Sequence, residues 1–194
     1  MNEVRYIEKN DIKRIREYFK YRNRIVMLNM MNIGINIAIR ISDLHKLRFE
    51  QIPKSGIFNI KEQKTGKRKV IVFNEACIKA VDDLKKFYKS LGYSTKEGYL
   101  FKSLDRVNVK NHKDVPITPY STGRHLREAK EFLNIEYAIG THSFRKTWGH
   151  YYYVETKDIG FIMKALNHSS VGTTLRYIGI EQEYMNEAYR NFIL

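Results

Sequence analysis

Cysteine is nearly absent from the 194-residue chain, which contains only Cys77. A lone cysteine excludes an intramolecular disulfide and a metal cluster held by several thiolates. We also expect no secretory signal peptide, because the first residues show no n-region followed by an apolar h-region. These absences favour a cytoplasmic protein.

Long apolar runs are also missing. The most apolar segment, residues 25–39, is interrupted by Asn29, Asn32, Gly34 and Asn36, and it is too short to cross a bilayer. Neither end carries a lipidation motif or an amphipathic anchor, so we expect no membrane partner. Repeats and low-complexity segments are absent, and 43% hydrophobic content fits one domain with its own core.

Acidic residues are few beside the basic ones. The chain has 21 Asp and Glu against 35 Lys and Arg, a formal net charge of +14 that is spread along the sequence rather than gathered in a tail. A folded surface with this charge predicts a polyanionic partner. With membranes set aside, we expect that partner to be double-stranded DNA.

Apolar residues mostly recur at helical spacing, and one segment changes to the period of strands. Residues 57–60 and 70–73 form two predicted strands around the turn at 64–67, whose Gly66 suits a hairpin. Residues 93–116 are basic and lack sustained periodicity. We expect helices at residues 10–19, 24–39, 42–47, 75–91, 119–133, 142–154 and 157–166, around Tyr177, and in the tail. The fold class is therefore α+β, mainly helical, with a small antiparallel β-hairpin carrying Lys64.

The stretch from residue 141 to 177 has the residues of an active site. His142 and Arg145 are three residues apart directly after Thr141, a residue type that caps helices. On a helix they share one face at the N-terminal end, where free N–H groups favour an anion. His168 follows on a later segment, and nine residues later comes Tyr177, a side chain that can act as a nucleophile.

Attack of a tyrosine on a phosphodiester needs a hydroxyl that can become a phenolate, cations around the non-bridging oxygens, and an acid for the departing 5′-oxygen. Arginine suits the oxygens because its planar fork donates two N–H groups and stays charged. Lysine suits the acid because burial among cations lowers its pKa. The candidate set that supplies all three is Arg40, Lys64, His142, Arg145, His168 and Tyr177.

The order of these residues resembles that of the tyrosine recombinase, or phage integrase, family. The resemblance lies in Ala-Ile-Arg-Ile-Ser-Asp-Leu at residues 38–44, Glu-Gln-Lys-Thr-Gly-Lys at 62–67, His-Ser-Phe-Arg at 142–145, and Leu-Asn-His-Ser-Ser to Arg-Tyr at 166–177. It covers nearly all of the chain. Each fragment is weak alone, but their order and spacing are specific.

The resemblance implies a tyrosine recombinase catalytic-domain fold and a DNA strand exchange that needs no metal or nucleotide cofactor. It implies that Tyr177 attacks the scissile phosphate to give a 3′-phosphotyrosine and that Lys64 protonates the leaving 5′-hydroxyl. The other implied roles are a phosphate clamp for Arg40 and Arg145, acid and base for His142, and a further phosphate donor for His168.

Three features depart from the family pattern. Ala38 stands where many relatives have glycine before the arginine, and Asn167 replaces the glycine of Leu-Gly-His. Asparagine is the next most tolerant residue of the left-handed conformation, so the turn should survive. The third departure is the missing N-terminal core-binding domain. We therefore expect residues 1–194 to be one catalytic domain, excised or naturally compact, with weaker and less site-selective DNA binding than a full clamp.

Simpler interpretations exist for each residue taken alone. A single arginine is commonly an ion-pair partner, Lys64 would be a solvated turn lysine, and His168 would be structural. The apolar stripe of residues 181–194 fits packing on its own domain as well as docking on a neighbouring subunit of a tetramer on DNA. Two other function classes are a non-catalytic DNA-binding regulator with the recombinase fold and, more remotely, an RNA-binding or structural protein.

Overall fold

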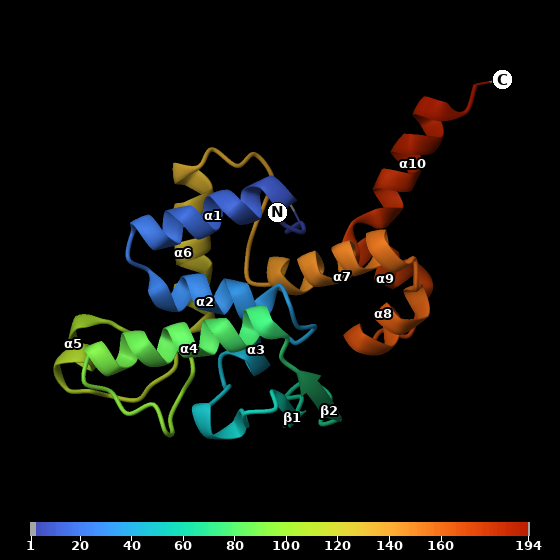
Figure 1. Ribbon diagram of the computed structural model, residues 1–194. Coiled ribbons are helices and arrows are strands. Elements are labelled where there is room, and N and C mark those ends of the chain that lie inside the picture. The colour runs from blue at the N-terminus through green and yellow to red at the C-terminus, as the bar shows by residue number, and fades with distance from the viewer. Residues whose placement is uncertain (1–2, 194) are drawn as a thin grey trace.

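The computed structural model describes residues 3–193, apart from the side chains of residues 181–184 and 188. In chain order its elements are α1 (Lys9–Tyr21), α2 (Ile25–Gly34), α3 (Ile41–Leu44), the short 3-10 helix η1 (Phe49–Gln51), β1 (Ile57–Lys61), β2 (Arg68–Val72), α4 (Glu75–Ser90), α5 (Arg106–Lys110), α6 (Pro119–Phe132), α7 (Ser143–Thr156), α8 (Ile159–Leu166), α9 (Val171–Ile178) and α10 (Ile180–Asn191). Figure 1 shows this arrangement. The predicted α+β class, mainly helical with one small antiparallel sheet, is confirmed.

Several element boundaries follow from capping chemistry. Asn74 accepts a hydrogen bond from the backbone N–H of Cys77 and opens α4, and Thr118 opens α6 with a proline in its first turn. The predicted helix over residues 24–39 is too long, because α2 ends at Gly34. There the side chain of Asn36 donates to the carbonyl of Asn32 and competes with helix continuation.

The hairpin is a regular two-stranded antiparallel pair. Ile57 faces Val72 at its open end, and Lys61 faces Arg68 beside the turn. The turn closes where the N–H of Glu62 donates to the carbonyl of Lys67 and the N–H of Gly66 donates back to Glu62. This geometry holds residues 62–67 as a defined turn next to α3, as the sequence predicted.

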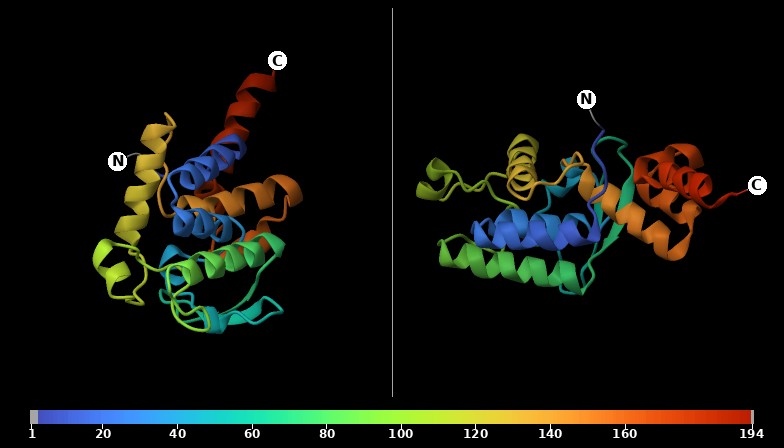
Figure 2. Two further views of the ribbon diagram at one scale, coloured as in Figure 1. Left: turned by 60° about the vertical axis from the view of Figure 1, so that its left-hand side comes forward. Right: turned by 90° about the horizontal axis from the view of Figure 1, so that it is seen from above.

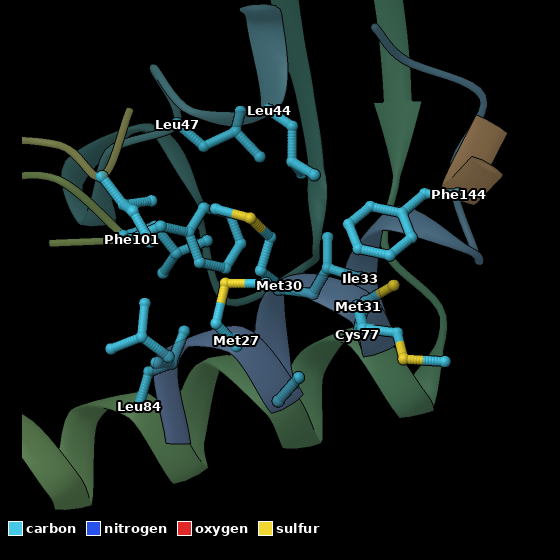
Figure 3. Close-up of a cluster of buried hydrophobic side chains, with 14 of the residues drawn as sticks. Met27, Met30, Met31, Ile33, Leu44, Leu47, Cys77, Leu84, Phe101 and Phe144 are labelled. Atoms are coloured by element: carbon cyan, nitrogen blue, oxygen red, sulfur yellow. The ribbon is translucent and has the colours of Figure 1, made fainter. Parts of the chain in front are cut away.

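The main hydrophobic core, which we call the large core, lies between α1, α2, α4, α6 and the hairpin. Its centre is the buried helix α2, whose methionines pack against Leu84 of α4 and against Phe101 (Figure 3). Phe144, from the first turn of α7, enters the same core. This contact fixes the N-terminal end of α7 against α2.

A second, smaller cluster joins α8, α9 and α10, which we call the C-terminal module. Ile162, Leu166, Ile178 and Ile180 are buried there against Ala38. Helix α7 connects the two parts, and Figure 2 shows α8–α10 standing to one side of the body. Within the described residues, no helix is long and apolar enough to cross a membrane.

Candidate active site

Arg40 lies at the boundary between the large core and the hairpin. It is the residue before α3, and its Nη1 lies 2.9 Å from Oε1 of Glu62, without the angle of a hydrogen bond. Glu62 also accepts a hydrogen bond from the hydroxyl of Thr65. Burial alone would raise the pKa of Glu62, but the contacts with Thr65 and Arg40 outweigh it and lower that pKa. The guanidinium of Arg40 is thus held against an ionised, buried carboxylate.

Helix α7 carries His142 and Arg145 at its N-terminal end, as predicted, but the predicted cap is wrong. The helix begins at Ser143, and Thr141 does not cap it. Instead the backbone N–H of Gly140 donates to the hydroxyl of Ser143, and the N–H of Ser143 donates to the carbonyl of Gly140. This small turn leaves the His142 side chain at the surface beside the helix end.

Arg145 is buried, with 3% of its surface exposed. Its Nη2 donates to the carbonyl of Leu166 over 2.5 Å, which ties α7 to the end of α8. Its Nη1 is buried and has no hydrogen-bond partner among the described residues, and the same holds for Nη1 of Arg40. Buried donors without partners are rare in folded proteins and require an explanation. The Nη1 of Arg145, beside the guanidinium of Arg40 that Glu62 already contacts, fits a place for an anion.

His168 follows α8 through the turn predicted at Asn167. Asn167 has φ 54° and ψ 48°, so asparagine takes the left-handed conformation that glycine would otherwise supply. Nδ1 of His168 lies 3.2 Å from the hydroxyl of Thr174 on α9. Burial, together with Arg145 and Arg40, lowers the pKa of His168, so its ring is mainly neutral at pH 7.

Tyr177 lies on α9 with its ring edge-on to His168, the centroids 5.0 Å apart and the planes at 87°. Burial raises the pKa of the Tyr177 hydroxyl, while the positive charges of Arg145 and Arg40 act in the opposite direction. On the other side, Nζ of Lys146 lies 4.9 Å from the centre of the Tyr177 ring. The side chain is therefore half-buried among cations.

Lys64 lies in the hairpin turn and is exposed. Its charge contributes to lowering the pKa of His142, after burial, Arg145 and Lys146 and ahead of Arg40. The structure thus gathers Arg40 from beside the hairpin, His142 and Arg145 from the start of α7, and His168 and Tyr177 from the C-terminal module. Lys64 stays on the exposed turn, near enough for its charge to act on His142. Within the described part of the chain, no three His, Cys, Asp or Glu side chains gather as metal ligands.

Comparison with known sequences agrees with this geometry. Residues 5–183 match the model of the phage integrase family. The chain is 34% identical over 189 residues to a probable integrase/recombinase, YoeC, of Bacillus subtilis, a match that covers 97% of this chain and 95% of YoeC. This chain belongs to the phage integrase family. It is also 30% identical to the tyrosine recombinase XerC of Caldanaerobacter subterraneus, over 88% of this chain but 44% of XerC.

Solved structures show the same fold. The XerA recombinase superposes with a TM-score of 0.73 at 22% identity, covering 98% of this chain and 65% of the XerA chain. A lambda integrase tetramer bound to a Holliday junction gives 0.66 at 16% identity, covering 91% and 49%. The predicted tyrosine recombinase catalytic-domain fold is confirmed, and the chain is a site-specific recombinase of this family.

Other residues of this integrase-family site were not predicted from the sequence. Glu62 is 3% exposed and Asp43 6% exposed, both close to the arginines, and Asp43 accepts a hydrogen bond from the backbone N–H of Gln63. Lys146 is 5% exposed and forms an ion pair with Glu3. The available signal was their position within or beside the motifs: Asp43 is in the first arginine segment, Glu62 opens the lysine segment, and Lys146 follows Arg145 directly.

Proposed function

We propose that this chain cleaves and rejoins double-stranded DNA through a covalent bond between Tyr177 and a 3′-phosphate. The observation that carries the proposal is the buried guanidinium of Arg145, whose Nη1 has no hydrogen-bond partner among the described residues, close to the guanidinium of Arg40 and to the half-buried Tyr177. Two such cations can bind both non-bridging oxygens and stabilise the charge that develops on them in the transition state. The structure therefore supports a phosphodiester as the substrate.

The chemical step exchanges one phosphoester bond for another, so no external energy source is needed. The phenolic oxygen of Tyr177 forms a bond to phosphorus, the bond from phosphorus to the 5′-oxygen breaks, and that oxygen takes a proton from Lys64. The proton of Tyr177 goes to His142, because burial and neighbouring cations lower the pKa of His142 and leave its ring free to accept. Attack by a 5′-hydroxyl on the phosphotyrosine reverses each transfer and rejoins a strand.

His168 completes the proposed phosphate site. Its contact with Thr174 and its position at the edge of the Tyr177 ring fix the orientation of the imidazole. With a lowered pKa, it donates one N–H to a phosphate oxygen without adding a third permanent positive charge. Lys64, exposed on the turn, lies where a bound duplex can reach it.

A DNA partner is supported by charge and by the structural relatives. The net charge of +14 suits a duplex. A XerH recombinase bound to its difH substrate is among the superposable structures, with a TM-score of 0.70 at 16% identity. With DNA as its partner, we propose that the protein acts in the cytoplasm.

We further propose that the tail, residues 181–194, docks on an adjacent protomer in a head-to-tail ring of four. Helix α10 projects away from the rest of the molecule (Figure 1). The apolar side chains of Met185 and Tyr189 on α10, and of Phe192 and Ile193 directly after it, are between 46% and 88% exposed. Tyr184 and Ala188, which the sequence placed on the same stripe, lie outside the described side chains. The exposed stripe supports docking over packing on its own domain.

Removal of residues 181–194 tests the docking. We expect the shortened chain to cleave a half-site substrate at a normal rate and to lose synapsis and complete recombination, measured by native gel shift and by product formation. Loss of half-site cleavage, or unfolding, would assign the tail to its own domain.

A nicked suicide substrate carrying the cognate site tests the central proposal. Covalent protein–DNA adduct, detected by denaturing electrophoresis, is expected for the wild type and not for Tyr177→Phe. The substituted chain should keep its stability and DNA affinity, since one hydroxyl is all that is removed. A wild type that binds DNA without forming an adduct would favour the non-catalytic regulator, and adduct from Tyr177→Phe would assign another nucleophile.

A further inference from the structure

A second hairpin lysine, Lys69, has contacts that the proposed reaction does not use. It lies on β2, and its Nζ donates to two backbone carbonyls, that of Ala38 over 2.8 Å and that of Ala165 over 2.7 Å. Ala38 is two residues before Arg40, and Ala165 is three residues before His168. One ammonium group thus connects two segments that each lead directly to a proposed site residue.

The two carbonyls are open to such a contact for different reasons. Ala165 belongs to the last turn of α8, where carbonyl oxygens lack partners within the helix. The next carbonyl, of Leu166, accepts from Arg145. Lys69 and Arg145 therefore bind successive carbonyls at the negative end of α8, where cations are stabilising. Ala38 lies between α2 and α3, outside any helix or strand.

A cation at this position is costly, which argues against an incidental contact. Burial first, then the charges of Arg145 and Arg40, lowers the pKa of Lys69 to about 8, while Glu62 and Asp43 act in the opposite direction. An apolar side chain at the same strand position would avoid that cost but would leave both carbonyls without this donor. A lysine at this position therefore provides the two hydrogen bonds to the carbonyls of Ala38 and Ala165, which an apolar residue cannot make.

We propose that Lys69 is a positioning residue, which joins the segment before Arg40 to the end of α8. This connection fixes the position of the C-terminal module relative to Arg40 and Arg145. The proposal rests on the function proposed above. Lys69 is distinct in role from Lys64, because its protons are directed at backbone carbonyls whereas Lys64 is exposed on the turn.

The first experiment measures the connection without any reaction. Amide hydrogen exchange is followed over residues 38–42 and 164–169 in the full chain, in Lys69→Met, and in Lys61→Met as the matched control. Lys61 is exposed on β1 of the same hairpin, so this variant removes an equal charge. We expect faster exchange in both segments for Lys69→Met alone. Unchanged exchange, or a change in one segment only, would overturn the proposed connection.

The second experiment separates positioning from proton donation. Single-turnover cleavage of the suicide substrate is measured against enzyme concentration for the wild type, Lys69→Met and Lys69→Arg. We expect Lys69→Met to lower the maximal rate by about 10²-fold, the effect of a small misplacement, with half-saturation unchanged. Lys69→Arg should recover most of that rate, because its guanidinium also donates to two carbonyls. An equal maximal rate for Lys69→Met would overturn the proposal.

A substrate with sulfur in place of the bridging 5′-oxygen makes the distinction sharper. A thiolate leaves without needing an acid, because thiols have a pKa of about 8.5. The sulfur should therefore restore cleavage by Lys64→Met and leave the deficit of Lys69→Met in place. Restoration in Lys69→Met would make Lys69 an acid and overturn its positioning role. If the wild type forms no adduct, the proposed function fails, and the exchange experiment still decides the connection made by Lys69.

Discussion

The large core and the C-terminal module differ in how firmly they are held, and the proposed active site draws on both. In the large core, Phe19, Met30 and Leu84 have no exposed surface and are enclosed by several helices. In the module, α8–α10 pack around a small cluster with partly buried aromatic rings at its edge. The two are joined by α7 and by a few polar contacts to backbone carbonyls.

This difference matches a division of chemical roles. The proposed phosphate clamp, Arg40 and Arg145, is anchored in or beside the large core, and the proposed nucleophile Tyr177 is carried by the module. A rigid clamp keeps its geometry whether or not substrate is bound, which is what transition-state stabilisation requires. A nucleophile on a lightly packed unit can be repositioned against the clamp at low cost, since locally weak packing permits local opening. A substitution in the module should therefore be able to displace Tyr177 without unfolding the large core.

The largest effect on cleavage is expected when either arginine of the proposed clamp, Arg40 or Arg145, is replaced by alanine. Arg145→Ala and Arg40→Ala should each lower the single-turnover cleavage rate by about 10²–10³-fold, roughly 3–4 kcal/mol for a lost transition-state donor. Arg145→Ala alone also removes the bond to Leu166, so it should additionally speed hydrogen exchange at residues 164–169. Arg106→Ala, at an exposed position on α5, is the matched control and should change neither. Normal cleavage by either clamp variant would make that arginine structural.

Acid should weaken the large core through His45. This side chain is 4% exposed, its Nε2 lies 2.9 Å from the hydroxyl of Thr122, and burial lowers its pKa to about 4. Between pH 6.5 and 4 the unfolded chain therefore binds more protons at His45 than the folded chain does. The free energy of unfolding falls as the pH decreases through this window, by up to about 3 kcal/mol from this residue.

Urea unfolding at pH 7.5 and 4.5 measures the effect. We expect His45→Gln to lose less stability than the wild type between the two pH values, and His112→Gln, at an exposed position, to behave like the wild type. An equal loss in His45→Gln and the wild type would show that other groups, such as the buried His125, account for the acid sensitivity.

Local sequence signals predicted most of the elements, and the six candidate site residues stay a prediction. The hairpin at 57–72, the caps at Asn74 and Thr118, and the left-handed turn at Asn167 each depend on a few neighbouring residues, so the sequence contains the required information. The family motifs supplied the order Arg, Lys, His, Arg, His, Tyr, and the fold places five of these residues together, with Lys64 on the turn close enough for its charge to act on His142.

The parts that were not predicted depend on contacts between distant segments. Lys69 meets carbonyls 31 and 96 residues away, and Lys146 meets Glu3 across 143 residues. Nothing in the local pattern distinguishes Lys69 from Lys67 two residues earlier. The burial of Glu62 could not be seen either, because an acid within a basic turn normally remains solvated. Such partners follow from the tertiary arrangement alone.

The smallest expected effects come from alanine substitutions at two glycines, Gly34 in the large core and Gly149 beside the C-terminal module. At both positions an added Cβ would lie too close to a neighbouring side chain. A Cβ at Gly34, the last residue of α2, would lie 2.8 Å from Cδ2 of Phe144 in the large core. A Cβ at Gly149 of α7 would lie 2.7 Å from Cγ2 of Ile178 in the module. Each alanine substitution should cost about 1–3 kcal/mol of overpacking, because neither neighbour can move away freely.

The consequences should differ by region. Gly34→Ala strains the core that carries the cooperative unfolding transition, so its main effect should be a lower urea midpoint. Because Phe144 directly precedes Arg145, cleavage by the folded fraction should slow as well. Gly149→Ala pushes α9 away from α7, and because Tyr177 directly precedes Ile178, it should slow adduct formation while the main urea midpoint changes less. A Gly149→Ala protein that loses as much stability as Gly34→Ala and still cleaves normally would show that the module and the large core unfold as one unit, with the nucleophile set independently of the contact between α7 and α9.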